Sequence, residues 1–578
     1  MKFDLWRILF RPQSRMVSPL PGAFLMLACF SFLAPGFLRA EVALGEHGAV
    51  ASVNEIATRA GINALKHGGN AVDAAVATAL TLGVVDGFNS GIGGGCFMLI
   101  RLQNGKFLAI DGREMAPAAA THDMFLRNGK ADSDLSQLGA LASGVPGSLA
   151  AYEAAIRQCG KIPFREHLLN AAKVAEDGFP VTRHYANVVK HVAEDLSRFE
   201  SSKAIFLHDG KPFEPGEILR QPDLAKTYRE VARNGIGWFY GGAFADATEK
   251  WMRQNGGIMT GADLKNYRIE FREPIFTKYR GHTIVSFPPP SSGGVHVAEI
   301  LNILDRYPLN KMPSNSPEMI HLVAEAMKLA FADRAYWLGD PAFAKVPRGL
   351  VSEKYAKQLA KKIDLRRATV VPEHGIPEKS NDDLFGKHTT HFSAADAEGN
   401  WVACTATVNT SFGSKVVIPG TGVVLNNQMD DFSAQPGVPN FFGLVGAEAN
   451  AVAPGKRPLS SMSPTLVLKD GKPILSVGAA GGPTIISQTV LAIINVLDYG
   501  MNIDQAIASP RFHHQWSPNE LKVENALGQQ TFHALELLGH TLKPVESLGV
   551  SQAVGKNPKG KGLVGAADSR ASGRADAW

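Results

Sequence analysis

Threonine residues stand at both ends of a predicted β-hairpin in the second half of the chain. Thr389 and Thr390 open a run of alternating polar and apolar residues, and Thr407 lies near the end of the next run. With the turn centred on Glu398, residue 389 lies opposite residue 407, at a Cβ separation of about 4.5–5.5 Å that lets two hydroxyl groups share a hydrogen bond. Strand alternation points Thr390 to the other face, where we expect a structural role. Threonine is also common in ordinary strands, so the spacing alone favours an ordinary hairpin without a chemical role.

A second chemical candidate is the pair Gly481 and Gly482, which lies between a predicted strand and a predicted helix in residues 476–497. Backbone N–H groups at the start of a helix can converge on an anion, and glycine leaves that approach open. The glycine-rich run of residues 91–96 precedes a strand instead of following one, which argues against a dinucleotide-binding loop. We expect tight backbone packing in that run.

Helices and strands alternate along the chain, and their boundaries carry clear signals. Asn70 precedes an Ala-rich helical segment, and Ser316 followed by Pro317 marks the start of another helix. Strands are predicted in residues 93–102 and, after a turn at residues 104–105, from residue 106 onward. This mixture predicts a layered α/β or α+β domain. The second helix has apolar residues at helical spacing: Ile320, Val323, Met327 and Phe331.

Residues 366–388 interrupt this pattern. They are polar and rich in proline and turn-forming residues, so we expect an exposed connection. A core strand is predicted to begin directly afterwards, at residue 389. The chain could therefore be cut at this junction without loss of the fold.

The first 40 residues differ from the rest. A basic region ending at Arg15 precedes an apolar stretch over residues 21–38, and Ala40 offers a small residue before polar sequence. These features predict a secretory signal peptide, residues 1–40, cut near Ala40. An uncleaved N-terminal anchor and a lipoprotein signal through Cys29 are the alternatives.

The charge of the chain belongs mainly to this segment. Residues 1–40 contain five Lys/Arg and one Asp, and the whole chain of 578 residues has a formal net charge of +5. The remainder is close to neutral, so charge gives no reason to expect binding to nucleic acid or to a membrane surface. Beyond the signal, Cys96, Cys159 and Cys404 have unrelated spacings, which fit neither a disulfide framework nor a metal cluster.

Several short motifs occur in order along the chain: SGIGGG, GREMAP, TTHFS, NTSFGS, LNNQMDDFS, APGKRP, KRPLSSMSPT and SPRFHHQW. Together they resemble the gamma-glutamyltransferase (gamma-glutamyltranspeptidase) family of N-terminal-nucleophile hydrolases, over nearly the whole chain after the signal. The resemblance implies a four-layer αββα sandwich, with helices on both faces of two stacked antiparallel sheets. Cys96 departs from the family, since relatives often have another glycine at that position.

The resemblance further implies an inactive precursor that cuts itself between His388 and Thr389. The Thr389 hydroxyl attacks the preceding carbonyl, and hydrolysis of the resulting ester frees the Thr389 α-amine. With an ordinary pKa of about 7.7–8.0, this amine can take the proton of its own hydroxyl, so one residue supplies nucleophile and base. Thr407 hydrogen-bonds the nucleophile and assists cleavage. The implied product is a heterodimer of a large subunit, residues 41–388, and a small subunit, residues 389–578.

A gamma-glutamyl donor carries an α-carboxylate and an α-ammonium group, and each needs a partner when it leaves water. By resemblance, Arg113 binds the α-carboxylate, because a planar guanidinium matches a carboxylate. Asp431 binds the α-ammonium. The assisting residues implied by the family are Ser460 and Ser461 at the carboxylate, Gln428 and Asn409 at the ammonium, and Gly481 and Gly482 as the oxyanion hole.

Other residues near these motifs receive different roles. Asp430 and His391 are expected to be structural, His391 as a packed strand residue. Two adjacent acids can also ligate a metal, but no further ligands accompany Asp430 and Asp431, and no cofactor is expected. Residues 436–446 resemble the lid loop of bacterial members, with Phe442 at a position where some relatives have a tyrosine.

The sequence thus predicts an exported, periplasmic enzyme. It would transfer the gamma-glutamyl group of glutathione or related donors, through Thr389, to water or to an amino acid or peptide. One alternative is an acylase for glutaryl-7-aminocephalosporanic acid, whose glutaryl group lacks the α-ammonium that Asp431 would bind. The other is a periplasmic glutathione-binding protein without catalysis, which would remain a single chain.

Overall fold

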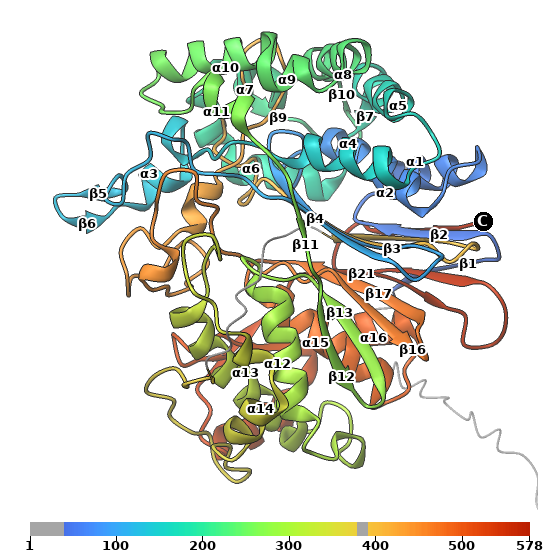
Figure 1. Ribbon diagram of the computed structural model, residues 1–578, viewed down its shortest axis with the longest axis vertical. Helices are drawn as coiled ribbons and strands as arrows, with labels where there is room; N and C mark the ends of the chain where they lie inside the picture. The colour runs from blue at the N-terminus through green and yellow to red at the C-terminus, as the bar shows by residue number, and fades with distance from the viewer. Residues whose placement is uncertain (1–39, 379–390) are drawn as a thin grey trace, which may run out of the picture. The chain divides into compact units, whose positions relative to one another are not determined.

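The structure is a computed structural model that describes residues 40–378 and 391–578 (Figure 1). The predicted signal peptide, the His388–Thr389 bond and Thr390 lie outside the described residues. Two seven-stranded sheets form the centre of the described part. Every strand pairing within these two sheets is antiparallel.

The strand order of each sheet mixes segments from distant parts of the sequence. The first sheet has the order β1 (Glu41–Gly45), β22 (Leu563–Ala567), β21 (Val550–Lys556), β17 (Lys472–Ala480), β16 (Thr465–Lys469), β13 (His282–Ser286), β12 (Ile275–Tyr279). The second sheet has the order β11 (Glu270–Arg272), β4 (Phe107–Gly112), β3 (Gly95–Arg101), β15 (Trp401–Thr407), β14 (His391–Asp396), β2 (Gly48–Ser52), β23 (Arg574–Ala577).

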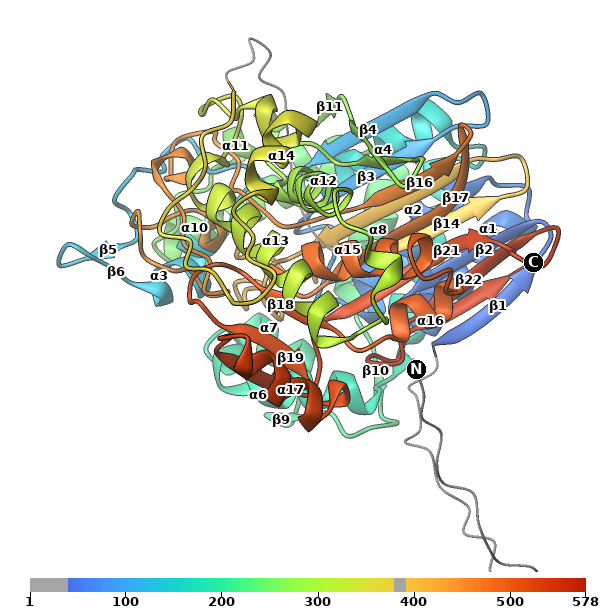
Figure 2. The ribbon, with the colours of Figure 1, turned by 90° about the horizontal axis from the view of Figure 1, so that it is seen from below.

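The inner faces of the two sheets pack against each other, and helices cover both outer faces (Figures 1 and 2). The rings of Phe97 on β3 and Phe287 after β13 stack between the sheets with centroids 4.2 Å apart. Helices α1 (Glu55–Lys66), α2 (Ala71–Val85) and α4 (Ser148–Cys159) pack on the second sheet. Helices α12 (Ser292–Leu304), α15 (Thr484–Leu497) and α16 (Ile503–Ala508) pack on the first. This arrangement confirms the predicted αββα sandwich.

Further helices and small sheets surround these four layers. The remaining helices are α3 (Ser133–Gln137), α5 (Phe164–Asp177), α6 (Arg183–Ser197), α7 (Glu200–Phe206), α8 (Pro222–Asn234), α9 (Gly237–Gly241), α10 (Ala243–Gln254), α11 (Gly261–Asn266), α13 (Pro317–Trp337), α14 (Glu353–Ala360) and α17 (Gln529–Leu537). The short strands are β5 (Leu126–Arg127), β6 (Lys130–Ala131), β7 (Phe179–Pro180), β8 (Leu207–His208), β9 (Lys211–Pro212), β10 (Ile218–Leu219), β18 (Phe512–His514), β19 (Leu521–Glu524) and β20 (Leu542–Val545).

Strands from before and after the gap at residues 379–390 are interleaved in both sheets. In the second sheet, β14 and β15 pair with each other and lie between β2 and β3. In the first sheet, β13 pairs with β16 and β1 pairs with β22. Each half of the chain therefore completes the hydrogen bonding of the other.

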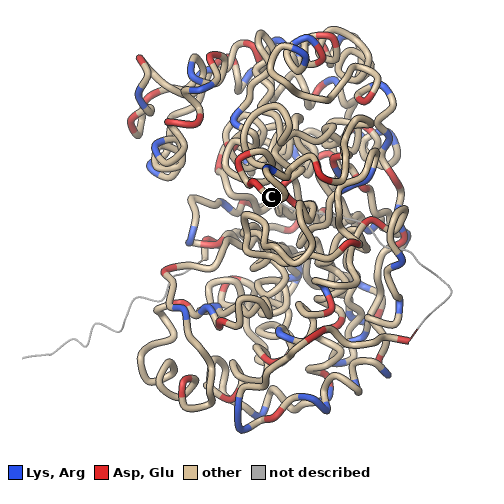
Figure 3. Tube along the Cα trace, turned by 90° about the vertical axis from the view of Figure 1, so that its left-hand side faces the viewer, with Lys and Arg blue, Asp and Glu red and all other residues tan. Residues whose placement is uncertain are grey.

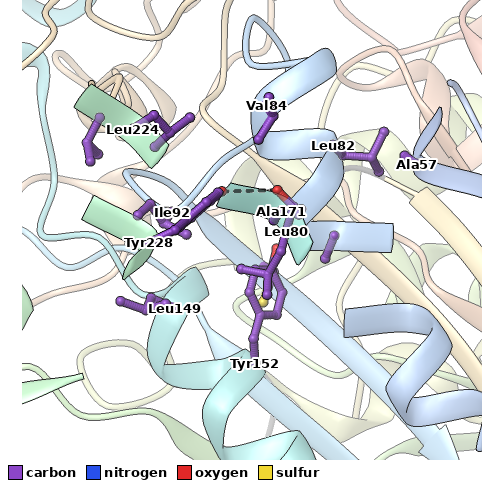
Figure 4. Packing of buried hydrophobic residues seen from close by; sticks show 14 of the residues in the cluster. Ala57, Leu80, Leu82, Val84, Ile92, Leu149, Tyr152, Ala171, Leu224 and Tyr228 are labelled. Atoms are coloured by element: carbon purple, nitrogen blue, oxygen red, sulfur yellow. Dashed lines mark hydrogen bonds between the residues drawn. The ribbon is translucent and has the colours of Figure 1, made fainter. Parts of the chain in front are cut away.

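Helix α2 lies at the centre of the largest core cluster, and all its residues are buried. Apolar residues of α4, α5 and α8 surround it (Figure 4). The hydroxyl of Tyr228 on α8 donates a hydrogen bond of 3.0 Å to the carbonyl of Leu80 on α2. A helix that is apolar on every face is stable in this position because protein covers all of it.

The sequence signals for helix starts are confirmed. The Asn70 side chain accepts hydrogen bonds from the backbone N–H groups of Val72 and Asp73, and the Asp73 side chain closes a capping box. Ser316 caps α13 by accepting from the N–H of Met319. Local side chains therefore define where both helices begin.

The hairpin register is also confirmed over the described residues. Strands β14 and β15 pair from His391 with Thr405 to Ala395 with Trp401, which centres the hairpin on residue 398. Asp396 fixes the turn, since its carboxylate accepts from the N–H groups at positions 399 and 400. The predicted Thr389–Thr407 pair would continue this register but lies outside the described residues.

Residues 366–378 form no helix or strand and are mostly exposed, as predicted for the connection. Gly375 is an exception, because its buried N–H donates to Asp333 of α13 at 2.5 Å. Basic and acidic residues are interspersed along the trace (Figure 3). Across the described residues, none of the helices combines the length and apolar character that crossing a bilayer requires.

Candidate active site

A cavity of about 220 Å³ lies where the chain leaves the ends of β15 and β17. Most of the predicted site residues line it: Thr407, Asn409, Asp431, Ser460, Ser461, Gly481 and Gly482, with the predicted lid residue Phe442. The wall also contains Phe441 and Leu444 of the predicted lid, and four residues that the sequence did not single out: Asn89, Arg334, Thr410 and Ser411. Thr389 lies outside the described residues.

Thr407 is the last residue of β15 and pairs with Gly95 of β3. Its Oγ1 accepts a hydrogen bond of 2.7 Å from the backbone N–H of Asn409, which leaves its own hydroxyl proton for another acceptor. A Cβ atom at Gly94 would lie 1.9 Å from the carbonyl oxygen of Thr407. The glycine run before β3 therefore serves close backbone packing, as predicted.

Gly481 and Gly482 form the turn between β17 and α15. Their φ angles are +133° and +59°, in the region that favours glycine. Thr484, the first residue of α15, donates its hydroxyl to the carbonyl of Gly481 at 2.8 Å. The turn therefore places backbone N–H groups near a helix N-terminus at the cavity wall, an arrangement that suits an anion.

Asp431 presents a carboxylate to the cavity and is held by two neighbours. Arg113 Nη2 lies 2.6 Å from Asp431 Oδ2, and Gln428 Nε2 donates to the same oxygen at 2.8 Å. Arg113 is fully buried and also contacts Glu114 at 3.1 Å. Arg113, the residue predicted to bind the α-carboxylate, therefore lies behind Asp431. In this structure Arg113 and Asp431, the residues predicted to bind the two opposite charges of the donor, pair with each other.

Two serines form another part of the wall. Ser460 Oγ accepts from the N–H of Met462 at 3.2 Å, and Ser461 Oγ lies 3.4 Å from Arg334 Nη2. Arg334 belongs to α13, and its Nε also donates to Ser292 Oγ at 2.9 Å. The structure thus adds a second arginine to the predicted site.

The sequence did contain a signal for Arg334. The predicted apolar face of α13 includes Met327 and Phe331, and Arg334 follows Phe331 at a spacing of three residues. A charged residue on a buried helix face is unusual unless it has a partner there. Asn89, Thr410 and Ser411 carry no such signal, because polar loop residues are common on any surface.

The predicted lid over residues 436–446 contributes Phe441 and Phe442 to the cavity. A Cβ atom at Gly482 would lie 2.5 Å from the ring of Phe442, so this ring packs directly on the glycine turn. Asp430 supports the loop, since its carboxylate accepts from the N–H of Phe441 at 3.3 Å and from the Ser136 hydroxyl at 2.6 Å. Burial raises the pKa of Asp430 to about 6.

His391 lies between the two sheets, as predicted for a packed strand histidine. Its Nε2 is 2.8 Å from Ser393 Oγ, which in turn is 2.8 Å from Ser476 Oγ on β17 of the opposite sheet. Burial lowers the pKa of His391 to about 3, so the ring is neutral at ordinary pH. Its place in this hydroxyl network gives it a structural role.

Among the described residues, His321, Glu325 and His540 offer ligand atoms within 4.8 Å of one another. However, Glu325 accepts from Lys328 at 2.6 Å and from the N–H of Thr369 at 3.0 Å. Nδ1 of His321 and Nε2 of His540 form a hydrogen bond of 2.7 Å. These contacts already satisfy the group, and a neighbouring ammonium disfavours a bound cation.

Two stacked antiparallel sheets between helix layers, with a cavity at the ends of their central strands, place the protein in the N-terminal-nucleophile hydrolase class. The cephalosporin acylase from Bacillus halodurans shares this fold, with a TM-score of 0.84 and 29% identity over 96% of this chain and 99% of that chain. The sequence profile described as Gamma-glutamyltranspeptidase matches residues 57–578. The chain belongs to the gamma-glutamyltranspeptidase family.

Two individual relatives illustrate this membership. The "Glutathione hydrolase proenzyme" of Escherichia coli (strain K12) is 46% identical over 532 residues, which cover 91% of this chain and 90% of the relative. The gamma-glutamyltranspeptidase structure of Helicobacter pylori has a TM-score of 0.54 and 39% identity, over 56% of this chain and 92% of that chain. The similarity therefore extends across both sides of the gap at residues 379–390.

Proposed function

We propose that the protein is a self-processing gamma-glutamyl transferase and glutathione hydrolase. The observation that carries this proposal is one cavity lined by residues of three family motifs, NTSFGS, LNNQMDDFS and KRPLSSMSPT, together with the glycine turn and the predicted lid, in a chain that matches the family over residues 57–578. The relative in Escherichia coli is described as a glutathione hydrolase proenzyme. The donor would be glutathione or another gamma-glutamyl amide.

The proposed reaction uses Thr389 after cleavage. Its α-amine takes the hydroxyl proton while Oγ adds to the γ-carbonyl carbon, and the N–H groups of Gly481 and Gly482 stabilise the oxyanion. Collapse of this intermediate expels the amine leaving group, which takes up the proton, and leaves a gamma-glutamyl ester. Water then releases glutamate and restores Thr389, or an amino acid or peptide amine accepts the acyl group.

The charges around Asp431 support this donor. Arg113 and Asp431 form an ion pair in the structure, and a zwitterionic gamma-glutamyl group carries one charge for each of them. The α-ammonium would bind Asp431 together with Asn409 and Gln428, and the α-carboxylate would bind Arg113 with the two serines. Exchange of one ion pair for two avoids leaving a buried charge without a partner.

Processing and export belong to the same proposal. Cleavage before Thr389 would give subunits of residues 41–388 and 389–578, which the interleaved strands would hold together as a heterodimer. The basic and apolar segments of residues 1–40 support secretion, with removal near Ala40, to the periplasm. Thr389 and the cavity residues together would supply the groups that this chemistry needs, so no cofactor is proposed.

The glutaryl-7-aminocephalosporanic acid acylase is the second candidate, because the fold is similar to a cephalosporin acylase. A glutaryl group has no ammonium, and Asp431 in the cavity would then lack a ligand. A glutathione-binding protein without catalysis is the third reading. It predicts an intact chain.

Denaturing electrophoresis of the purified protein and N-terminal sequencing of the smaller fragment test the proposal. We expect two fragments, with the smaller one beginning at Thr389. The variant Thr389→Ala should remain one chain and lose more than about 10³-fold in kcat, because it lacks the nucleophile. Gamma-glutamyl p-nitroanilide should react faster than glutaryl p-nitroanilide. An intact, active wild-type chain would refute the proposal, and faster glutaryl release would favour the acylase.

A further inference from the structure

Arg334 is a buried cation that reaches the cavity. Its relative exposure is 4%, and its side chain lines the cavity wall. Within the described part of the chain, its guanidinium donates to the hydroxyl oxygens of Ser292 at 2.9 Å and Ser461 at 3.4 Å. Burial lowers the pKa of Arg334 to about 10, against an opposing effect of Asp431, so the group stays protonated at neutral pH.

The two cavity arginines differ in their partners. Arg113 is already engaged by two carboxylates, Asp431 at 2.6 Å and Glu114 at 3.1 Å. The hydrogen bonds of Arg334 go to neutral hydroxyl groups. A buried guanidinium has five donors, and its desolvation is compensated best by an anion. Arg334 is therefore the cation of this site that is better prepared to receive a negatively charged ligand.

The serine hydroxyls are oriented for the same ligand. Ser461 Oγ accepts from Arg334, and Ser460 Oγ accepts from the backbone N–H of Met462. A hydroxyl that already accepts from the protein is free to donate its proton to an outside acceptor. Two O–H donors and a guanidinium then converge on one part of the wall, and this donor set suits a carboxylate.

We propose that Arg334 is a binding residue for the α-carboxylate of the donor, together with Ser460 and Ser461, and that it determines specificity for donors that carry this group. This inference rests on the proposed gamma-glutamyl transferase function. Arg113 would bind the same carboxylate once it exchanges its ion pair with Asp431, while Arg334 contacts the carboxylate from the cavity wall. Arg334 also orients Ser461, so its loss removes a charge and misaligns a hydroxyl.

The test compares two donors in the processed enzyme, gamma-glutamyl p-nitroanilide and 4-aminobutyryl p-nitroanilide, which lacks only the α-carboxylate. The enzyme concentration is raised until the slower donor is measurable. With Arg334→Gln, we expect kcat/KM for the gamma-glutamyl donor to fall about 10–100-fold, mainly through KM, since hydrogen bonds to a charged group are lost. The 4-aminobutyryl donor should change less than about threefold. Arg334→Lys should recover part of the loss, because it keeps the charge but not the planar fork.

The matched control is Lys328→Gln, which removes another buried cation of α13, paired with Glu325 at 2.6 Å. We expect Lys328→Gln to change both donors by the same factor. Equal losses for both donors with Arg334→Gln would overturn the inference, as would wild-type kinetics. Electrophoresis confirms that each variant is processed. A wild type that releases no gamma-glutamyl group would instead contradict the proposed function itself.

Discussion

At the scale of single residues, burial decides which titratable groups near the cavity can take part in chemistry. His391 is two residues from Thr389 in sequence, yet its ring is fixed between hydroxyl groups of β14 and β15. The neutral imidazole is the form that fits this network. A free N-terminal amine at residue 389 would supply the base without it.

The buried His391 predicts a pH dependence of stability. Its pKa is lowered from 6.5 to about 3 in the folded protein, so the unfolded chain binds a proton that the folded chain does not between these values. The free energy of unfolding should therefore fall as pH falls from about 6.5 towards 3, by up to about 1.4 kcal/mol per pH unit from this residue. Urea unfolding of His391→Gln at pH 4–7 should show a shallower slope than the wild type. An unchanged slope would contradict the assignment.

Charged residues were the least predictable part of the site. The family motifs gave Arg113, Asp431 and the two serines, and the structure brings these residues to one place. Sequence patterns could not tell which arginine faces the cavity, because that depends on how α13 packs against the serine loop. Arg334 comes from a helix whose spacing indicates only which face is buried.

At the scale of elements, the hairpin and the helix starts were predictable because local signals define them. Asp396 sets the turn that fixes the register of β14 and β15, and Asn70 and Ser316 cap their own helices. The order of the strands was not predictable in this way. It depends on contacts between residues that are hundreds of positions apart, such as Gly95 and Thr407.

Gly94 offers a test of this close approach between β3 and β15. Its Cβ would lie 1.9 Å from the backbone oxygen of Thr407, which cannot rotate away. Gly94→Ala should lower the free energy of unfolding by about 1–3 kcal/mol and reduce activity, because the strand shift displaces Thr407. Gly91→Ala is the control, since its nearest neighbour would be 3.7 Å away, an ordinary contact. Thermal unfolding and kcat distinguish the two; equal, small effects would argue against tight packing at Gly94.

At the scale of the whole molecule, both sheets depend on strands from the two sides of residue 389. Cleavage there would remove one covalent bond and leave every described strand pairing in place. The fragments should therefore elute together under native conditions. They should separate only when the sheets themselves unfold.

This arrangement predicts that unfolding of the processed enzyme depends on its concentration. Two fragments that dissociate on unfolding gain stability with concentration, by about 1.4 kcal/mol per tenfold change. Equilibrium urea midpoints should rise between low and high protein concentration for the processed enzyme. The single-chain variant Thr389→Ala should show one midpoint at all concentrations. A constant midpoint for the processed enzyme would mean that the fragments stay together after unfolding.

Strand interleaving also implies that the cleaved protein refolds less readily than the uncut chain folds. While residues 379–390 still join the halves, β2 and β3 need only find strands of their own chain to enclose β14 and β15. Once that link is cut, the same pairings require an encounter between two partly formed molecules with exposed sheet edges, which are prone to aggregate. The working lifetime of the cleaved enzyme would then depend on how slowly it unfolds, and unfolded enzyme would be replaced by new synthesis.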